Sequence, residues 1–244
     1  AAAMAPNATT CEPVAAARDF EVLLLDMDDC LYPQASGLDL HCKRLIEEYM
    51  HKELGIPAGD VADVCYRAYI EHGTTLAGLV SQGHRIDYDK WHAAVHAPMP
   101  YEECLRPDPA LREMLESLKQ RKFVFTNGDR AHVARVLKIL GVEDCFERVL
   151  DFETIMGADF HREGAPVVCK PQPLAFERAL ALAGVAADKA LFADDSRRNV
   201  KAAGGLGIFT VHVGGAADAE VPEGAAAAVQ CIKQLVDAVP ELRP

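Results

Sequence analysis

Short, largely apolar runs recur along the chain, and charged or turn-forming residues bound each of them. This pattern is typical of strands that are buried on both faces of a parallel sheet. The predicted strands cover residues 20–25, 122–126, 148–152, 190–193 and 207–213.

Between these runs, apolar residues recur at the three-and-four spacing of an amphipathic helix. One helix is predicted after Asp108-Pro109, an N-cap followed by proline at the first helical position. Two others are predicted to stop at Gly141 and Gly184. Alternating strands and helices imply an α/β fold, a Rossmann-like parallel sheet with helices on both faces.

One long interval breaks this alternation, because residues 34–103 contain no convincing strand. Apolar residues at helical spacing predict several helices there, one started by Asp60 and another over residues 87–96. The interval is therefore expected to form an all-helical cap inserted after the first strand. The predicted organisation is a disordered N-terminal tail over 1–18, a catalytic core over 19–33 and 104–244, and a helical cap over 34–103.

Composition narrows the classes of partner. Hydrophobic residues make up 50% of the 244 residues, enough for one sizeable core and a smaller module. The formal net charge of −12 argues against a nucleic-acid polymer as partner, since phosphate backbones are bound by basic patches. A small anionic substrate stays compatible with this charge if its pocket is locally positive.

Cysteine usage and hydropathy bear on location. The eight cysteines are scattered without a CxxC pair or close metal-ligand spacing, which suits a reducing compartment. No apolar run approaches the roughly 18–20 residues of a membrane span, and residues 1–18 lack the apolar region of a secretory signal. The protein is therefore expected to be cytoplasmic and not to associate with membranes.

Acidic residues crowd the position where the first predicted strand ends, at Asp26, Asp28 and Asp29. Ligands of open α/β sheets collect beyond the carboxyl ends of the strands, and alternate side chains point the same way, so Asp26 and Asp28 should face one cavity. Such a pair alone is more often a turn or a solvated strand end, but Asp194 and Asp195 end a second strand. Crowded carboxylates require a cation, and oxygen ligands favour Mg²⁺ over Zn²⁺.

Two further segments carry groups that suit a phosphate. Thr126-Asn127-Gly128 closes a predicted strand and opens a helix, where a hydroxyl and backbone N–H groups can cradle an anion, although an ordinary helix cap explains them too. Lys170 precedes a proline-initiated helix, where a lysine would normally be solvated. Its apolar approach indicates instead a lysine drawn into the site to balance phosphate and acids.

In this order, the four segments resemble the motifs of the haloacid dehalogenase superfamily of phosphohydrolases. The matching residues are Asp26 to Cys30 for Asp-x-Asp-x-Thr/Val, Thr126 for the second motif, Lys170 for the third, and Asp194 with Asp195 for the fourth. The resemblance covers about residues 20–215. Cys30 departs from the Thr or Val of the family but is still small, so altered fine positioning is expected rather than lost activity.

The resemblance implies a mechanism through an aspartyl-phosphate. It makes Asp26 the nucleophile and Asp28 the acid and base, with Mg²⁺ held by Asp26, the Asp28 backbone carbonyl and Asp195. The residues implied in phosphoryl binding are Thr126, Asn127, Gly128 and Lys170, with Asp194 and Asn199 orienting the ligands from behind.

Asp28 favours phosphoryl chemistry, since the dehalogenating branch keeps no acid at that position. Residues 26–33, 72–79 and 169–171 look like the pyrimidine-5'-nucleotidase-like group and plant nucleoside-monophosphate phosphatases such as xanthosine-monophosphate phosphatase. The expected activity is Mg²⁺-dependent hydrolysis of a small phosphorylated metabolite, a nucleoside 5'-monophosphate (xanthosine or pyrimidine), by a monomer or homodimer. The alternatives are a sugar-phosphate phosphatase, a phosphomutase, or a non-catalytic regulatory protein that keeps the fold.

Other residues within the predicted cap carry weaker signals. His92 and His96 have the i, i+4 spacing of a helical metal pair, but without a third ligand in the motif a surface or packing role is favoured. Trp91 and Tyr88 are expected in the core of the cap rather than as a base-stacking platform. The threonine pair at 74–75 is equally suited to capping a helix and to contacting substrate.

Overall fold

The computed structural model describes residues 18–162, 165–215 and 220–243. The predicted N-terminal tail, apart from its last residue, lies outside these ranges. In the described part of the chain no helix combines the length and the apolar character needed to cross a membrane. The seven cysteines described there are free thiols. The cytoplasmic location stays a prediction.

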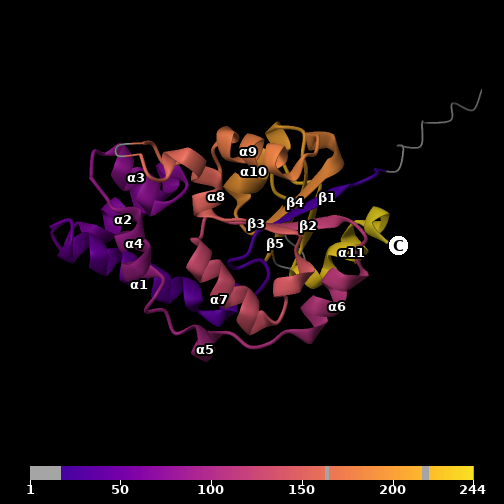
Figure 1. Ribbon diagram of the computed structural model, residues 1–244, viewed down its shortest axis with the longest axis horizontal. Helices are drawn as coiled ribbons and strands as arrows, with labels where there is room; N and C mark the ends of the chain where they lie inside the picture. Colours follow the sequence, from indigo (N-terminus) through magenta and orange to yellow (C-terminus); the bar gives the residue numbers. More distant parts are fainter. Residues whose placement is uncertain (1–17, 163–164, 216–219, 244) are drawn as a thin grey trace, which may run out of the picture.

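Six parallel strands form one sheet in the order β3-β2-β1-β4-β5-β6 (Figure 1). Their bounds are β1 Val22–Leu25, β2 Arg121–Phe125, β3 Arg148–Leu150, β4 Ala190–Asp194, β5 Phe209–Val213 and β6 Ala227–Val229. The first five confirm the predicted α/β sheet with small shifts of their ends, and β6 was not predicted. The predicted end of the third strand is wrong, because Asp151 instead caps helix α8 (Phe152–Met156) by accepting from the Thr154 N–H at 2.8 Å.

The register of the central strands decides which residues meet at the carboxyl edge. β1 is buried along its whole length, and Leu25 lies opposite Val124 of β2 and Ala193 of β4. Asp26 follows this row directly, and its N–H donates to the Ala193 carbonyl at 2.9 Å. Thr126 leaves the sheet beside it. The residues that follow β1, β2 and β4 therefore emerge together, as the parallel arrangement predicts.

Helices cover both faces of the sheet (Figure 1). On one face lie α9 (Pro173–Ala183) and α10 (Arg197–Gly205), and on the other α6 (Pro109–Ser117), α7 (Arg130–Leu140) and α11 (Leu235–Ala238). Short 3-10 turns occupy Gln34–Ser36, Glu143–Cys145, Gly157–Asp159, Ala187–Lys189, Ile232–Gln234 and Pro240–Leu242. The predicted cap of α6 is confirmed, since Asp108 accepts from the Leu111 N–H at 2.9 Å. The predicted stops at Gly141 and Gly184 are confirmed as well.

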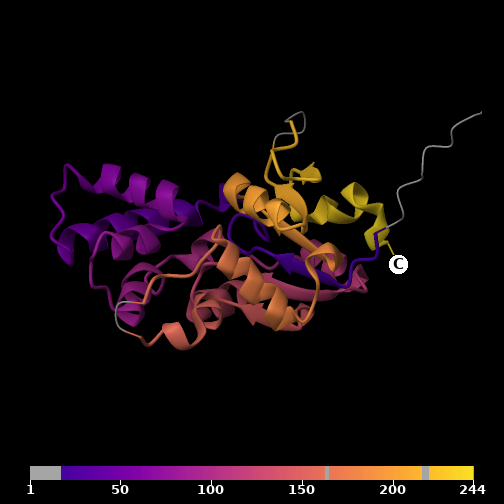
Figure 2. The ribbon, with the colours of Figure 1, turned by 90° about the horizontal axis from the view of Figure 1, so that it is seen from above.

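Residues 34–103, called the cap segment below, contain helices and no strand. The helices are α1 (Leu38–Lys52), α2 (Val61–His72), α3 (Thr75–Ser81), α4 (Tyr88–Val95) and the start of α5 (Tyr101–Cys104). Helices α1 to α4 gather beyond the carboxyl end of β1 (Figures 1 and 2). The division of the chain into a core and a cap domain stays a prediction.

The cap segment contacts the rest of the protein at the end of α2. Gly73 has a φ of 92°, and a Cβ atom there would lie 2.4 Å from the backbone oxygen of Lys170, so a side chain does not fit. Arg198 donates from Nη1 to the carbonyls of Tyr69 at 2.7 Å and Ile70 at 2.8 Å. The backbone of the cap segment therefore lies directly against the loop that carries Lys170.

Candidate active site

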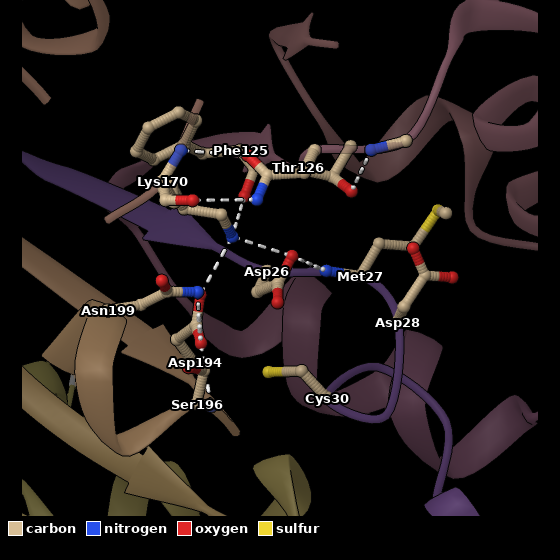
Figure 3. Close-up of polar contacts among 12 residues, drawn as sticks. Asp26, Met27, Asp28, Cys30, Phe125, Thr126, Lys170, Asp194, Ser196 and Asn199 are labelled. Carbon is tan, nitrogen blue, oxygen red and sulfur yellow. Dashed lines mark hydrogen bonds and ion pairs between the residues drawn. The ribbon is translucent and has the colours of Figure 1, made fainter. Parts of the chain in front are cut away.

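The Asp26 carboxylate lies beside the ammonium group of Lys170, where three strands end (Figure 3). Oδ1 of Asp26 is 2.8 Å from Lys170 Nζ and accepts from the Met27 N–H at 2.8 Å. The same Nζ donates to Asp194 Oδ2 and to the Phe125 carbonyl, both at 2.7 Å. Lys170 is 1% exposed. The structure thus places this lysine among acids, as its apolar approach indicated.

Asn127 fixes the backbone of the loop that carries Lys170. Its Oδ1 accepts from the Lys170 N–H at 2.9 Å, and its Nδ2 donates to the Lys170 carbonyl at 3.0 Å. The buried Thr126 accepts at Oγ1 from the Gly128 N–H at 3.0 Å. The Asn127 side chain therefore holds the loop that carries Lys170. The backbone N–H of Asn127 is left as the group suited to a phosphoryl oxygen.

Asp194, the last residue of β4, is fully buried and has both oxygens engaged. Asn199 Nδ2 lies 3.0 and 3.1 Å from the two oxygens, and the Ser196 N–H donates to Oδ1 at 2.8 Å. With Lys170 on Oδ2, this carboxylate is satisfied within the protein. Asp194 is therefore suited to positioning Lys170, whereas the next residue, Asp195, is only partly buried and faces the cavity.

The acidic cluster fits a hard divalent cation. Carboxylate oxygens of Asp26, Asp194 and Asp195 all lie within 4.8 Å of one another, and one ammonium group, that of Lys170, faces them. Burial and the neighbouring Asp194 raise the pKa of Asp26 well above its ordinary value. Burial, followed by Asp194, also raises the pKa of Asp195 to about 7. A surplus of negative charge with oxygen-only donors is the environment in which Mg²⁺ binds.

The Asp28 carboxylate is not part of that cluster and is held by a separate hydrogen-bond network. Its Oδ1 accepts from the Tyr32 hydroxyl at 2.5 Å and from His132 Nε2 at 2.8 Å. His132 is buried, and its Nδ1 forms a 2.7 Å hydrogen bond with the Tyr101 hydroxyl. Burial alone would raise the pKa of Asp28, but His132 and Tyr32 lower it to about 2. Burial opposes a protonated His132, but Asp28 prevails and raises the pKa of the imidazole.

Sequence reasoning missed His132 and both tyrosines. The available signal was position, because His132 lies in the first turn of the helix that follows the Thr126 strand end. Gly128 permits the contact, since a Cβ atom there would lie 2.7 Å from His132 Cδ2. The sequence predicted Gly128 as a phosphate-binding residue; the structure adds that it makes room for the imidazole.

Cys30, the departure from the family motif, ties the Asp26 loop to the sheet. Its thiol donates to the Ala193 carbonyl at 3.7 Å, and the side chain is buried. A thiol is a weak donor, so this tie is looser than one made by a hydroxyl. The geometry agrees with a small effect on positioning.

One cavity of about 290 Å³ brings the predicted site residues together. Those that line it are Asp26, Asp28, Thr126, Asn127, Gly128, Lys170 and Asp195. Thr74 also lines it and caps α3 by accepting from the Ala77 N–H at 3.1 Å, so the capping role is confirmed and a contact with substrate stays a prediction. Trp91 borders the cavity but is buried and packs edge-on against Tyr49 at 5.0 Å, as expected of a cap core residue.

A second cavity of about 470 Å³ adjoins the first and shares Asp28 and Asp195 with it. Residues of α1 and α2 form its walls. Among them, Tyr66 and Tyr69 are 66% and 44% exposed, unusually open for aromatic side chains. Sequence reasoning did not single out these tyrosines, because their spacing on α2 resembles that of any amphipathic helix.

Comparison with known sequences gives one family and a yeast relative. The family described as haloacid dehalogenase-like hydrolases matches residues 20–207. Phosphate metabolism protein 8 of Saccharomyces cerevisiae is 27% identical over 198 residues, which cover 77% of this chain. The chain spans 60% of the length of that yeast protein.

Solved structures share the fold at low sequence identity. A HAD phosphatase from Thermococcus onnurineus aligns with a TM-score of 0.57 and 16% identity, covering 92% of this chain and 100% of that one. The L-2-haloacid dehalogenase of Xanthobacter autotrophicus aligns with a TM-score of 0.54 and 15% identity, covering 88% of this chain and 96% of that one. YfnB of Bacillus subtilis, in a magnesium-bound form, aligns with a TM-score of 0.54 and 16% identity, covering 90% of this chain and 98% of that one. At these identities the likeness concerns the fold alone.

Proposed function

The chain belongs to the haloacid dehalogenase-like hydrolases, and we propose that within this family it is a Mg²⁺-dependent phosphomonoesterase that works through an aspartyl-phosphate. The observation that carries the proposal is the Asp28 carboxylate, held by His132 at 2.8 Å and lining the same cavity as Asp26. An ester oxygen needs a proton as it leaves, whereas a halide ion does not. An acid held at this place therefore favours phosphate ester hydrolysis over dehalogenation.

In the first step, a carboxylate oxygen of Asp26 forms a bond to phosphorus while the bond from phosphorus to the ester oxygen breaks. Lys170 holds Asp26 in place and offsets the charge of the phosphoryl group. The Nε2 proton of His132 passes along its hydrogen bond to Asp28 and from Asp28 to the leaving oxygen, so the step ends with an Asp28 carboxylate and a neutral His132. The neutral imidazole keeps its Nδ1 proton and donates it in the hydrogen bond to the Tyr101 hydroxyl.

In the second step, water attacks phosphorus and the bond from phosphorus to Asp26 breaks. Asp28 takes the proton of the water as the new bond forms and passes it to His132 Nε2, which returns the pair of Asp28 and His132 to its starting state. Inorganic phosphate leaves and the Asp26 carboxylate is restored. Asp28 thus acts first as acid and then as base. It is suited to this cycle because His132, within hydrogen-bond distance, stores the proton.

Asp26 and Asp195 are the residues proposed to hold Mg²⁺, because the oxygens of Asp194 are already satisfied. The resemblance implies the Asp28 backbone carbonyl as a further ligand. When bound, the ion screens the repulsion between the carboxylates and the phosphate. The single ammonium group among three carboxylates supports this need for a cation.

For the substrate, we propose a nucleoside 5'-monophosphate. The cavity of about 470 Å³ begins at Asp28, where the leaving oxygen would depart, and continues along α1 and α2. Tyr66 and Tyr69 offer exposed rings on this path, and aromatic rings stack on bases of any sequence. The yeast relative, named for phosphate metabolism, supports phosphate chemistry without naming a base.

Hydrolysis assays test the proposal in two stages. The chain should release phosphate from p-nitrophenyl phosphate with Mg²⁺ and not after chelation, while Asp26→Asn stays inactive in both. A panel of nucleoside monophosphates and sugar phosphates, compared by kcat/KM, then tests the substrate class. Higher values for sugar phosphates would replace the nucleotide proposal with a sugar-phosphate phosphatase, and isomerisation without phosphate release would indicate a phosphomutase. No turnover of any of these would favour a non-catalytic regulatory protein.

A further inference from the structure

A third cavity, of about 410 Å³, lies where α4 of the cap segment faces the first turn of α7. His92, Asp129 and Glu153 line it, and each offers a ligand atom within 4.8 Å of the other two. The three residues come from α4, from the N-cap of α7 and from α8. Of the predicted pair of His92 and His96, only His92 belongs to this group, and Asp129 and Glu153 supply its other ligand atoms.

The two carboxylates of this group are held in place by the backbone. Asp129 is 4% exposed, and its Oδ1 accepts from the N–H groups of Ala131 at 2.9 Å and His132 at 3.1 Å. The oxygens of Glu153 accept from the Arg130 N–H at 3.2 and 3.0 Å. Carboxylates fixed in this way lose little side-chain entropy when they bind an ion.

The histidines are also oriented by their neighbours. His92 is 8% exposed, and its ring packs edge-on against Phe152 with centroids 4.9 Å apart. His96 donates from Nδ1 to Asp129 Oδ2 and stacks on His132 at 4.6 Å. Carboxylates that ligate metals are in turn hydrogen-bonded, and such outer partners orient the ligand.

The charge of the cavity favours a cation over an anion. Asp129 and Glu153 supply two carboxylates, while the Arg135 guanidinium, which also lines the cavity, is engaged by Glu102 at 2.6 and 3.0 Å. One imidazole with two carboxylates differs from the oxygen-only acidic cluster near Asp26. Mixed nitrogen and oxygen donors suit first-row transition metals such as Zn²⁺ rather than Mg²⁺.

We propose that His92, Asp129 and Glu153 bind a divalent transition-metal ion such as Zn²⁺, with His96 positioning Asp129. The ion joins the cap segment to the core, because His92 belongs to α4 and the two carboxylates to α7 and α8. The site shares no ligand with the phosphoryl-transfer residues, so it does not depend on the proposed function.

Zinc titration of the full chain tests the site. The protein is freed of metal by chelation and returned to buffer with excess Mg²⁺, which competes with Zn²⁺ for the oxygen-only acidic cluster near Asp26, and Zn²⁺ binding is followed by calorimetry. One Zn²⁺ per chain is expected. His92→Ala and Glu153→Gln should each weaken binding at least about tenfold, since even outer partners of metal sites contribute about 10–100-fold. Zn²⁺ should also raise the melting temperature of the wild-type chain more than that of either variant.

Two controls make the location of the ion decisive. His41→Ala removes a histidine of α1 that is not among the residues lining the cavity, and Asp195→Asn alters the other acidic cluster. Both should bind Zn²⁺ as the wild-type chain does. Glu153→Gln changes shape little at a half-buried position, so it carries the test if His92→Ala fails to fold. The proposal would be overturned if the wild-type chain did not bind Zn²⁺, or if Glu153→Gln bound it as tightly as the wild type. It would also be overturned if Asp195→Asn no longer bound Zn²⁺.

Discussion

Nε2 of His132 lies 2.8 Å from Oδ1 of Asp28, although the two residues are 104 positions apart in the sequence. The loop after β1 supplies the acid, and the first turn of α7 supplies the imidazole. Because Tyr32 and His132 both bond the same oxygen, the orientation and the proton of Asp28 are governed by residues outside its own motif. This relationship gives the most specific prediction for the reaction.

His132→Ala should slow hydrolysis most for substrates whose leaving oxygen needs a proton. General acid–base catalysis contributes about 10²–10⁴-fold, and a loss of about 10–100-fold in kcat is expected for a nucleoside monophosphate, with KM little changed. p-Nitrophenyl phosphate, whose leaving group departs without protonation, should lose much less. His132→Gln keeps a donor to Asp28 and should recover part of the loss. Equal losses on both substrates would show that the imidazole has only a structural role.

Asp26→Asn should abolish turnover while keeping the fold, because the amide has the shape of the carboxylate but cannot act as the nucleophile. Losses of several orders of magnitude in kcat are typical for such residues. Burial and Asp194 raise the pKa of Asp26, so its charge is unfavourable in the metal-free protein, and the variant should melt at a higher temperature. A purified variant with more than about a tenth of wild-type kcat would contradict the covalent mechanism.

Asp195→Asn should shift the Mg²⁺ dependence of activity to higher concentrations. Mg²⁺ binds through few protein oxygens, so the loss of one anionic ligand weakens affinity substantially. Asp194→Asn is the matched variant, and its Mg²⁺ shift should be smaller. It should instead lower the melting temperature, because the buried Lys170 loses a charged partner at 2.7 Å. Activity titrated against Mg²⁺, together with thermal melts, distinguishes the two, and the reverse order of Mg²⁺ shifts would exchange their roles.

Tyr66→Ala should raise KM for nucleoside monophosphates by about fivefold or more, since stacking of one base contributes about 1–3 kcal/mol. Ribose 5-phosphate lacks a base, and its KM should stay unchanged. Ile70→Ala is the control, because Ile70 is likewise exposed on α2, at 44%, but is not among the residues lining the cavity. Steady-state kinetics on both substrates decide the matter, and a parallel rise for ribose 5-phosphate would exclude base stacking.

The ion pair of Asp28 and His132 should stabilise the fold within a limited pH window. The pKa of Asp28 is lowered from 3.8 to about 2, so its contribution is present above 3.8 and is lost as pH falls through 2. The pKa of His132 is raised, so its contribution is complete below 6.5 and is lost as pH rises through the raised value. Urea unfolding of the metal-free wild type and of His132→Gln should therefore differ most between these limits. A difference that is constant across pH would contradict the pairing.

The sequence predicted most of the sheet because its strands are short apolar runs buried on both faces. β6 escaped prediction because Ala227 and Ala228 have low strand propensity, and edge pairing with β5 decides their conformation. The strand predicted over residues 148–152 was too long because the apolar Phe152 follows Asp151 and was counted with the strand. Only the capping bond of Asp151 shows that the chain has already turned into a helix.

The residues of the candidate site were predictable where their roles follow from their own sequence motif. Asp26 and Thr126 directly follow strand ends, so the topology brings them together, whereas Lys170 was predicted from the apolar residues that precede it. His132 and Tyr66 were not predictable, because their roles depend on the distance between elements far apart in the chain. A histidine on a helix resembles any core histidine until the opposite element is known.

The contact of Gly73 with the backbone of Lys170 limits how this protein can be re-engineered. A cap taken from a relative would be joined most simply in the loops before and after its helices, and its specificity residues would travel with it. The joint that matters is elsewhere, at a glycine with no space for a methyl group beside the carbonyl of the buried lysine. A transplanted cap with any other residue there would push on the lysine loop and misplace the ammonium group. Exchange of caps between relatives therefore requires a glycine at the position of Gly73.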